Sequence, residues 1–286
     1  MKSTRRSALK SMLLAGMAPL LRIEEEVNHV TKGKIRHSVC KWCYKDISLE
    51  ELSAASSEIG LSSIELLGPE QWKVVNKYDL TCAVGSVLKD GYGIANCFNR
   101  KAHHADLEDI YMEAIPLAKK AGIQTLICFS GNKDGIDDEE GLENCRIGLQ
   151  RIMPVAEKAG INIMMELLNS KVNHPDYQCD RTWWGVELCK RVGSENFKLL
   201  YDIYHMQIME GDVIRTIQDN SSFIGHYHTG GVPGRAEIDE TQELNYPAIV
   251  KAIADTGYQG FIGQEFIPKK ADKLKSLKAA VTLCSV

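Results

Sequence analysis

The sequence predicts a single-domain α/β protein, a (β/α)8 barrel, from two repeated patterns and from its length. Short apolar runs recur roughly 25 to 40 residues apart, which is about the length of one strand with its crossover helix. A helical pattern that ends in Ala-Gly-Ile occurs at 116–123 and again at 154–161, and the glycine is expected to end each helix in a left-handed conformation. The chain has 286 residues, 44% of them hydrophobic, and no Pro/Gly/Ser-rich linker divides it. This suits one barrel, since such domains have about 250 residues.

Eight strands are expected, with helical patterns between most of them. The first helix begins with a capping box, in which Ser48 is followed three residues later by Glu51. A later helix opens at Asp106. Pro116 and Pro154 lie inside helical patterns and are expected to kink these helices or to shift their starts. The expected strands are 35–38, 63–67, 81–86, 124–129, 161–167, 197–202, 223–228 and 260–266.

The beginning of the chain differs from the rest. Residues 1–21 combine a basic start, with Arg5 and Arg6 adjacent, with a short apolar run that is too short to span a bilayer. This resembles a cleavable twin-arginine export signal, which predicts a periplasmic protein. The alternative is a disordered basic start on a cytoplasmic protein. Residues 22–34 then connect this segment to a barrel domain at 35–286.

Composition narrows the range of partners. The net charge of -4 argues against a nucleic-acid binder, which normally shows a basic patch or stripe. A small-molecule substrate fits better, with no membrane association in the mature form and with a homo-oligomer left open. Nine cysteines are scattered through the chain. Cys40 and Cys43 have redox or zinc spacing, but a second pair is missing, so packing is the favoured interpretation.

Polar residues that can bind a metal end four consecutive apolar runs. They are Glu166, Asp202, His228 and Glu265. Because function in a (β/α)8 barrel is built at the carboxyl ends of the strands, we expect the four side chains to converge there. Three carboxylates and one imidazole suit one divalent ion, with Mn or Mg favoured over Co or Zn. Alternatively, each is an isolated polar residue at a strand end. His226, two residues before His228, either extends this site or is a core histidine.

Several segments between residues 35 and 270 carry a resemblance to a known family. The chain resembles the hydroxypyruvate isomerase family within the xylose isomerase-like TIM-barrel superfamily, which also contains the ketose 3-epimerases. In that superfamily a Glu, an Asp, a His or Gln and a second Glu hold the metal, which implies the same four ligands here. A histidine at the third position is typical of the epimerases. The segments that carry the resemblance are 37–44, 64–69, 103–104, 129–132, 166–170, 202–207 and 226–235.

The ligand set predicts proton transfer next to a carbonyl. A divalent ion that contacts a carbonyl and the adjacent hydroxyl stabilises an enediolate, and Glu166 and Glu265 would remove and return the proton. The expected reaction converts hydroxypyruvate to 2-hydroxy-3-oxopropanoate. A ketose or keto-sugar 3-epimerase is the first alternative, and a metal-binding protein without turnover is less favoured. A hydrolase like endonuclease IV would need more histidines at the metal site and a basic face.

Four further residues are expected to bind substrate. The resemblance implies that His205 hydrogen-bonds a substrate oxygen, where the alternative is a solvated loop histidine. Arg235 follows a Gly/Pro-rich loop and suits a carboxylate or hydroxyl, unless it is a surface arginine. Trp42 is expected to form a wall of the pocket or to be packed. Of His103 and His104 at most one points into the site, and His104 is the candidate, against a capping or solvated role.

Overall fold

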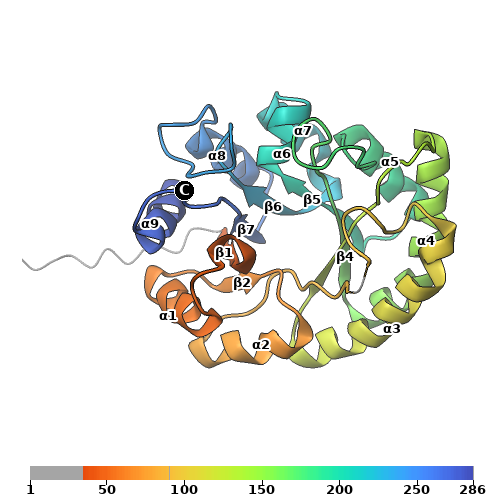
Figure 1. Cartoon of the computed structure of the whole chain (residues 1–286), viewed down its shortest axis with the longest axis horizontal. Coiled ribbons are helices and arrows are strands. Elements are labelled where there is room, and N and C mark those ends of the chain that lie inside the picture. The colour runs from red at the N-terminus through yellow and green to blue at the C-terminus, as the bar shows by residue number, and fades with distance from the viewer. Residues whose placement is uncertain (1–34, 90, 286) are drawn as a thin grey trace, which may run out of the picture.

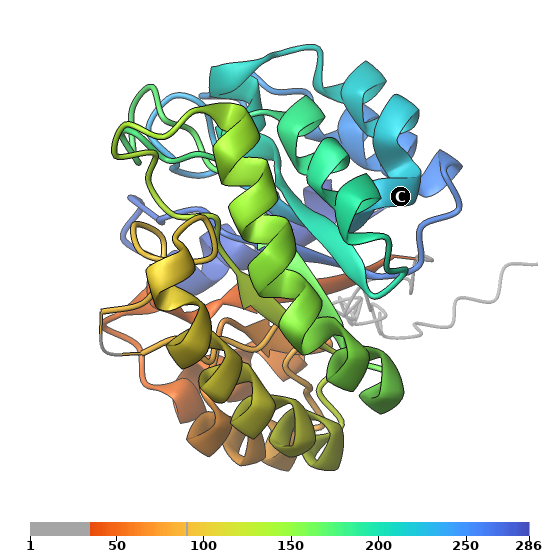
Figure 2. The same cartoon turned by 90° about the vertical axis from the view of Figure 1, so that its right-hand side faces the viewer.

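The computed structural model describes residues 35–89 and 91–285 (Figure 1). Within these residues seven parallel strands form one sheet in the order β2-β1-β7-β6-β5-β4-β3. The sheet curls around a central axis and the helices cover its outer face (Figures 1 and 2). The predicted barrel architecture is therefore confirmed. The strands are β1 Arg36–Cys40, β2 Ser63–Glu65, β3 Thr125–Cys128, β4 Asn162–Glu166, β5 Phe197–Asp202, β6 Ile224–Thr229 and β7 Phe261–Gln264.

The helices begin and end at the signals that the sequence contains. Ser48 caps the first helix, where its hydroxyl accepts the backbone N–H of Glu51 at 3.1 Å. Gly122 and Gly160 end their helices with φ angles of 75° and 70°, in the left-handed region. The α-helices are α1 Leu49–Ile59, α2 Pro69–Val75, α3 His104–Ala121, α4 Asp138–Ala159, α5 Thr182–Val192, α6 Ile203–Met209, α7 Val213–Asn220, α8 Tyr246–Asp255 and α9 Lys273–Leu283. Short 3-10 helices are η1 Lys41–Tyr44, η2 Asn76–Tyr78, η3 Lys101–His103 and η4 Ser221–Phe223.

The segment predicted as the third strand, 81–86, lies between β2 and β3 but pairs irregularly. Gly85 bridges Leu67 on one side and Leu126 on the other. At Ala83 the backbone N–H donates to the hydroxyl of Ser63 at 2.7 Å instead of to a backbone carbonyl. This side-chain hydrogen bond interrupts the ladder, so the eighth position of the barrel is filled by an irregular chain.

Two prolines lie inside long helices. Pro116 is within α3 and Pro154 within α4, and neither shifts the start of its helix. Of the two expected outcomes, the shifted starts were wrong, because each helix buries an apolar face on both sides of its proline and this packing outweighs the lost hydrogen bond. The expected kinks stay a prediction. Ile115 and Ala118 are fully buried around the first proline. Helix α3 begins at His104, two residues before the predicted Asp106.

The buried apolar side chains form two clusters. Val84, Ile127, Met164 and Leu200 form a small apolar cluster, and a larger core includes many side chains of the surrounding helices. All nine cysteines are buried and free. Among the described residues, none of the helices is long and apolar enough to cross a membrane. The predicted signal 1–21 and connecting segment 22–34 lie outside the described residues.

Candidate active site

The four predicted metal ligands meet at the carboxyl ends of β4 to β7. Glu166 and Asp202 are the last residues of β4 and β5, His228 lies in β6, and Glu265 directly follows β7. Each offers one ligand atom, these atoms lie within 4.8 Å of one another, and all four residues are buried. We call Glu166, Asp202, His228 and Glu265 the acidic cluster. Their convergence follows from the parallel register, in which Asp202 pairs with His228.

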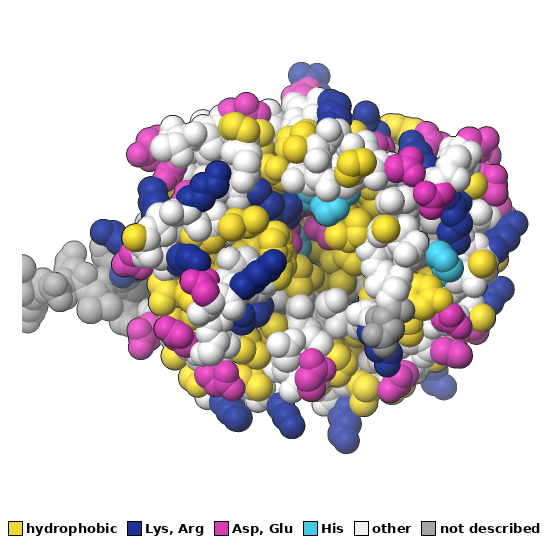
Figure 3. All heavy atoms as spheres, viewed as in Figure 1, with side chains coloured by type: hydrophobic (Ala, Val, Ile, Leu, Met, Phe, Trp, Pro, Cys, Tyr) yellow, Lys and Arg dark blue, Asp and Glu magenta, His cyan; other side chains and the backbone are white. Residues whose placement is uncertain are grey.

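A cavity of about 670 Å³ opens beside the acidic cluster. Figure 3 shows it as a hollow near the centre of this face, with hydrophobic side chains around it. Its polar end includes Glu166, Glu265, His205 and Arg235. The other lining residues are Trp42, Leu66, Ser86, Ile94, Ile127, Phe129, Leu168, Val172, Asn173, His174, Tyr204, Gly234 and Ile267. The site is thus a concave, mostly apolar pocket with charged groups at one end, as small-molecule sites commonly are.

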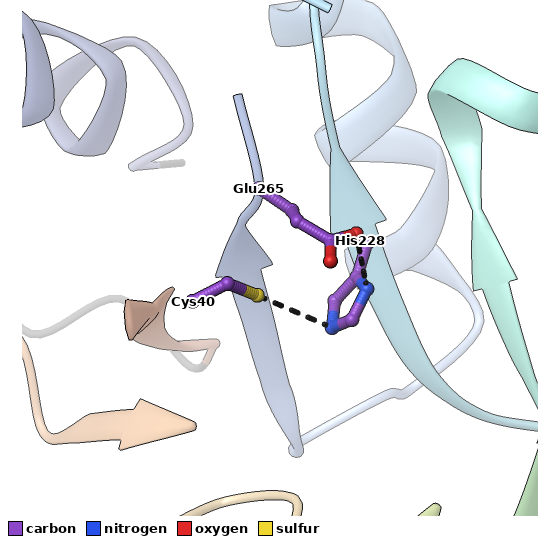
Figure 4. A group of neighbouring side chains, drawn as sticks. All are labelled: Cys40, His228 and Glu265. Carbon is purple, nitrogen blue, oxygen red and sulfur yellow. Dashed lines mark hydrogen bonds and ion pairs between the residues drawn. The ribbon is translucent and has the colours of Figure 1, made fainter. Parts of the chain in front are cut away.

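Glu265 has the densest set of partners. The indole Nε1 of Trp42 donates to its Oε1 at 2.7 Å, and Arg235 Nη2 donates to its Oε2. The Nδ1 atom of His228 lies 2.8 Å from the same Oε2 (Figure 4). Burial by itself raises the pKa of Glu265, but Arg235 and His228 outweigh it and hold that pKa well below its usual range. Glu265 is therefore ionised.

The pKa values of Glu166 and Asp202 are shifted in the opposite direction, above their usual range. Burial raises the pKa of Asp202 to about 8, helped by the nearby Glu265 and opposed by Arg235. Burial and Glu265 also raise the pKa of Glu166. These shifts show a surplus of buried acid, since the described residues bring three carboxylates together with only Arg235 and His228 as cations.

The arrangement fits a divalent cation. His228 Nδ1 is buried and lies near Glu265 and Glu166 without forming a hydrogen bond to either. This atom faces the carboxylate oxygens, and a cation among them would use the Nδ1 lone pair and neutralise the acidic surplus. Three oxygen donors and one imidazole suit Mn, Mg, Co or Zn.

His205 lies one turn into α6, next to the acidic cluster. Asp202 caps this helix, where its Oδ1 accepts the backbone N–H of His205 at 2.9 Å. The imidazole is fully buried, and both ring nitrogens face N–H donors. The backbone N–H of Asn169 lies 3.0 Å from Nδ1, and the Arg235 guanidinium contacts Nε2. Burial and Arg235 hold the pKa of His205 well below its usual range, so the ring is neutral.

Arg235 reaches the cavity from a loop after β6. Its backbone has a φ of 54°, and its Nε donates to the carbonyl of Glu265 at 3.0 Å. Its Nη2 donates to Asp202 Oδ2 at 2.8 Å and also to Glu265. A Cβ on Gly230 would lie 3.0 Å from the Cβ of Tyr204 and 3.2 Å from the Cγ of Arg235, so glycine makes room for this arginine. The guanidinium is buried and engaged with carboxylates of the protein itself.

The other two predicted substrate-binding residues lie in different places. Trp42 lines the cavity, 37% exposed, and orients Glu265. His104 does not line the cavity. Its Nε2 lies 2.9 Å from the carbonyl of Phe98, and its ring packs where a Cβ on Gly148 would be 2.8 Å away. Its expected role in substrate binding is therefore corrected to packing between α3 and α4.

Sequence reasoning missed one buried acid. Glu65 ends β2 and lies 3.0 Å from His226 and 3.2 Å from His228, measured from carboxylate oxygen to Nε2. Burial raises its pKa, but the two histidines outweigh it and lower that pKa to about 2. The strand-end rule that identified the four candidate ligands also applies to Glu65, which lies within the predicted strand 63–67. It was overlooked because it stands outside the run of four consecutive strands.

The family is shown by comparison with known proteins. Residues 45–282 match the xylose isomerase-like TIM barrel family. The chain belongs to this family, and the convergence of the four predicted ligands on one edge of the barrel agrees with the resemblance seen in the sequence.

Individual relatives match only parts of the chain at moderate identity. A 2-oxo-tetronate isomerase of Cupriavidus necator is 39% identical over 114 residues, which cover 40% of this chain and 43% of the relative. The hydroxypyruvate isomerase of Escherichia coli is 31% identical over 169 residues, covering 57% and 63%. Each alignment spans less than two thirds of the relative. The crystal structure of a D-psicose 3-epimerase from Clostridium cellulolyticum has a TM-score of 0.68 at 17% identity, covering 87% of this chain and 97% of that one, and so supports the fold.

Proposed function

We propose that this protein is a metal-dependent isomerase of small α-hydroxy carbonyl compounds, with hydroxypyruvate to 2-hydroxy-3-oxopropanoate as the reaction. The observation that carries the proposal is that Glu166 and Glu265 belong to one buried ligand cluster and both line the cavity. The relatives named hydroxypyruvate isomerase and 2-oxo-tetronate isomerase support the substrate class.

The two glutamates suit opposite tasks in proton transfer. A bound divalent ion supplies Lewis-acid stabilisation of negative charge on two adjacent substrate oxygens. Glu265, held ionised by Arg235, suits the base that removes the proton from C3 of hydroxypyruvate. Glu166, whose pKa is raised, suits the acid that delivers a proton to C2. Two carboxyl groups with pKa values shifted apart are the usual pattern of a base and an acid.

The reaction is completed by transfer of the hydroxyl proton from O3 to O2, which leaves an aldehyde at C3 and a hydroxyl at C2. Two further residues support this proton transfer. His205 is neutral and borders the cavity, and its Nε2 would hydrogen-bond one of these oxygens once the substrate displaces the contact with Arg235. Trp42 keeps the Glu265 carboxylate in place through its indole N–H.

A keto-sugar 3-epimerase is the second candidate, and the cavity favours it in two respects. A volume of about 670 Å³ with an apolar wall exceeds the needs of a three-carbon acid. Arg235 is the only Lys or Arg among the described lining residues, and its guanidinium is engaged with Asp202 and Glu265. A substrate carboxylate would compete with these partners, whereas a neutral sugar would not. A protein that binds metal without turnover would not need both glutamates at the cavity.

Isotope exchange tests the proposal. The protein is stripped of metal with EDTA, reloaded with Mn²⁺ and incubated in deuterated water with hydroxypyruvate or with a panel of ketoses. We expect turnover only after reloading, with deuterium at the carbon next to the carbonyl. Deuterium in a ketose but not in hydroxypyruvate would select the epimerase. Undiminished turnover after stripping would refute metal dependence, and exchange in none of the substrates would favour a binding protein.

We further propose that residues 1–21 direct export by a twin-arginine route, which gives a periplasmic enzyme. The support is the adjacent pair Arg5 and Arg6 before a short apolar run. Replacing both by lysine should retain the protein in the cytoplasmic fraction of a bacterial host, whereas the wild-type chain should reach the periplasm. Retention of both the wild-type chain and the lysine variant in the cytoplasmic fraction would favour the cytoplasmic alternative.

A further inference from the structure

Glu65 lies on the far side of His228 from the acidic cluster. Its side chain is fully buried, with Oε1 3.2 Å from Nε2 of His228 and Oε2 3.0 Å from Nε2 of His226. The thiol of Cys40 also donates to Oε1, at 3.6 Å. One carboxylate therefore faces two imidazoles and a thiol, all of them buried.

The two nitrogens of His228 face different partners. Nδ1 faces Glu166 and Glu265, and Nε2 faces Glu65. Figure 4 shows the ring between Glu265 on one side and Cys40 on the other. A histidine can bind a metal through Nδ1 only when that atom carries a lone pair, so the ring proton must then be on Nε2. A proton on Nε2 in a buried site needs an acceptor, and the Glu65 carboxylate is within reach.

Cys40 is a second group that can influence the tautomer of His228. Its Sγ lies 3.7 Å from Nε2 of His228. If the thiol donated to Nε2, the ring proton would move to Nδ1 and block the ligand atom. Glu65 removes this competition because a carboxylate accepts from the thiol and from the imidazole together.

The fold makes room for this contact. A Cβ on Gly263 would lie 1.8 Å from Oε1 of Glu65 and 2.8 Å from Cδ2 of His228. Any other residue at 263 would push the two groups apart, and Gly263 lies in β7, paired with His228 of β6. The contact is therefore built by three strands that are distant in sequence.

We propose that Glu65 is a positioning residue, whose carboxylate accepts the Nε2–H of His228 and so directs the Nδ1 lone pair of His228 toward the metal. The inference rests on the proposed metal dependence. Hydrogen bonds of this kind orient metal-bound histidines, and their loss typically lowers metal affinity about 10–100-fold.

Mn²⁺ binding to the stripped protein is the first test, with free Mn²⁺ measured by electron paramagnetic resonance. Glu65→Gln keeps the size of the side chain but presents an amide N–H to Nε2 in one orientation and a weaker acceptor in the other. We expect its Kd for Mn²⁺ to rise about 10–100-fold. His226→Gln is the matched control, because it places an amide near the other oxygen of Glu65 without changing Glu65 or His228, and it should bind Mn²⁺ within about threefold of wild type. Circular dichroism and thermal unfolding check that both variants are folded.

The second test reads the ring proton directly, in protein loaded with diamagnetic Mg²⁺. In wild-type protein with ¹⁵N-labelled histidine, His228 should show a slowly exchanging Nε2–H resonance, assigned by its loss in His228→Gln. It should shift or disappear in Glu65→Gln and persist in His226→Gln. The wild-type spectrum decides the matter even if Glu65→Gln does not fold, since absence of this proton would overturn the inference.

The two tests separate the two proposals. Wild-type protein that binds Mn²⁺, together with a folded Glu65→Gln variant that binds it equally well, would overturn the role of Glu65 and leave the proposed function intact. Wild-type protein that binds no Mn²⁺ would refute the metal dependence, and with it the positioning role.

Discussion

Two groups of buried polar side chains differ in what they face. In the acidic cluster, charged side chains face one another and border a cavity. The second group, which we call the amide cluster, lies beside α4 and consists of Asn99, Asn144, Gln178 and His104. Its side chains are neutral and donate mostly to backbone: Asn99 Nδ2 to the carbonyl of Asn132 at 2.6 Å, and Asn144 Nδ2 to that of Asn99 at 3.0 Å.

The contrast shows that burial of polar groups does not by itself identify a site. The amide cluster holds loop backbone in place, because most of its donors end on a main-chain carbonyl. The acidic cluster has an excess of carboxylates, and most of its partners are other side chains. Charge surplus and access to a cavity therefore distinguish the candidate site from the amide cluster, and His104 was misassigned because the sequence reveals neither.

The largest expected effect is on turnover. Glu166→Gln or Glu265→Gln removes a proton-transfer group while keeping its shape, so kcat should fall by at least about 10²–10⁴-fold. It is measured on the substrate that shows deuterium exchange, with bound metal quantified in parallel. A variant with near wild-type kcat and bound metal would refute the two-glutamate mechanism and favour a single base.

Removing Arg235, a cation that contacts the acidic cluster, should lower stability. Arg235→Met leaves Asp202 and Glu265 buried without their arginine, which should lower the free energy of unfolding of the metal-free protein by about 3–5 kcal/mol. Urea denaturation measures it. Arg215→Met is the control, because its ion pair with Asp212 is exposed and should be worth less than about 1 kcal/mol. Equal losses in the two variants would mean that the charges of the acidic cluster are not coupled.

His37 tests burial without a charged neighbour. Burial lowers its pKa from 6.5 to about 4, and its Nε2 lies 3.3 Å from the hydroxyl of Ser285. Below pH 6.5 the unfolded chain takes up a proton that the folded chain refuses. The stabilisation is therefore complete above pH 6.5 and is lost as the pH falls toward 4, by at most about 3 kcal/mol. His37→Gln should flatten this part of the stability profile, measured by urea denaturation between pH 7 and 4.5. An unchanged slope would contradict the assignment.

The smallest expected effect is in the amide cluster. His104→Leu leaves the carbonyl of Phe98 without its partner, so the free energy of unfolding should fall by about 1–2 kcal/mol. Turnover should stay within about twofold of wild type, because the ring is not in the cavity. A loss of kcat with unchanged KM and unchanged stability would return His104 to the active site and erase the contrast between the two clusters.

The sequence by itself determined which residues lie at or near the carboxyl ends of the strands, and therefore which residues share an edge of the barrel. Apolar runs and left-handed glycines are local signals, and parallel strands bring their carboxyl ends together whatever the details of packing. This is why Glu166, Asp202, His228 and Glu265 were found together. The N-terminal cap by Ser48 was predictable for the same reason.

Tertiary structure alone decided which partner each side chain meets. Arg235 turns onto Asp202 and Glu265, and Glu65 reaches His228 across the barrel, because of contacts between segments far apart in the chain. Segment 81–86 does not form a regular strand, because one of its backbone N–H groups donates to a side-chain hydroxyl of β2. Pro116 stays inside α3 because the burial of that helix's apolar face outweighs one missing hydrogen bond. Spacing along the chain sets which edge a side chain occupies. Its orientation and charge state depend on neighbours that only the folded barrel supplies.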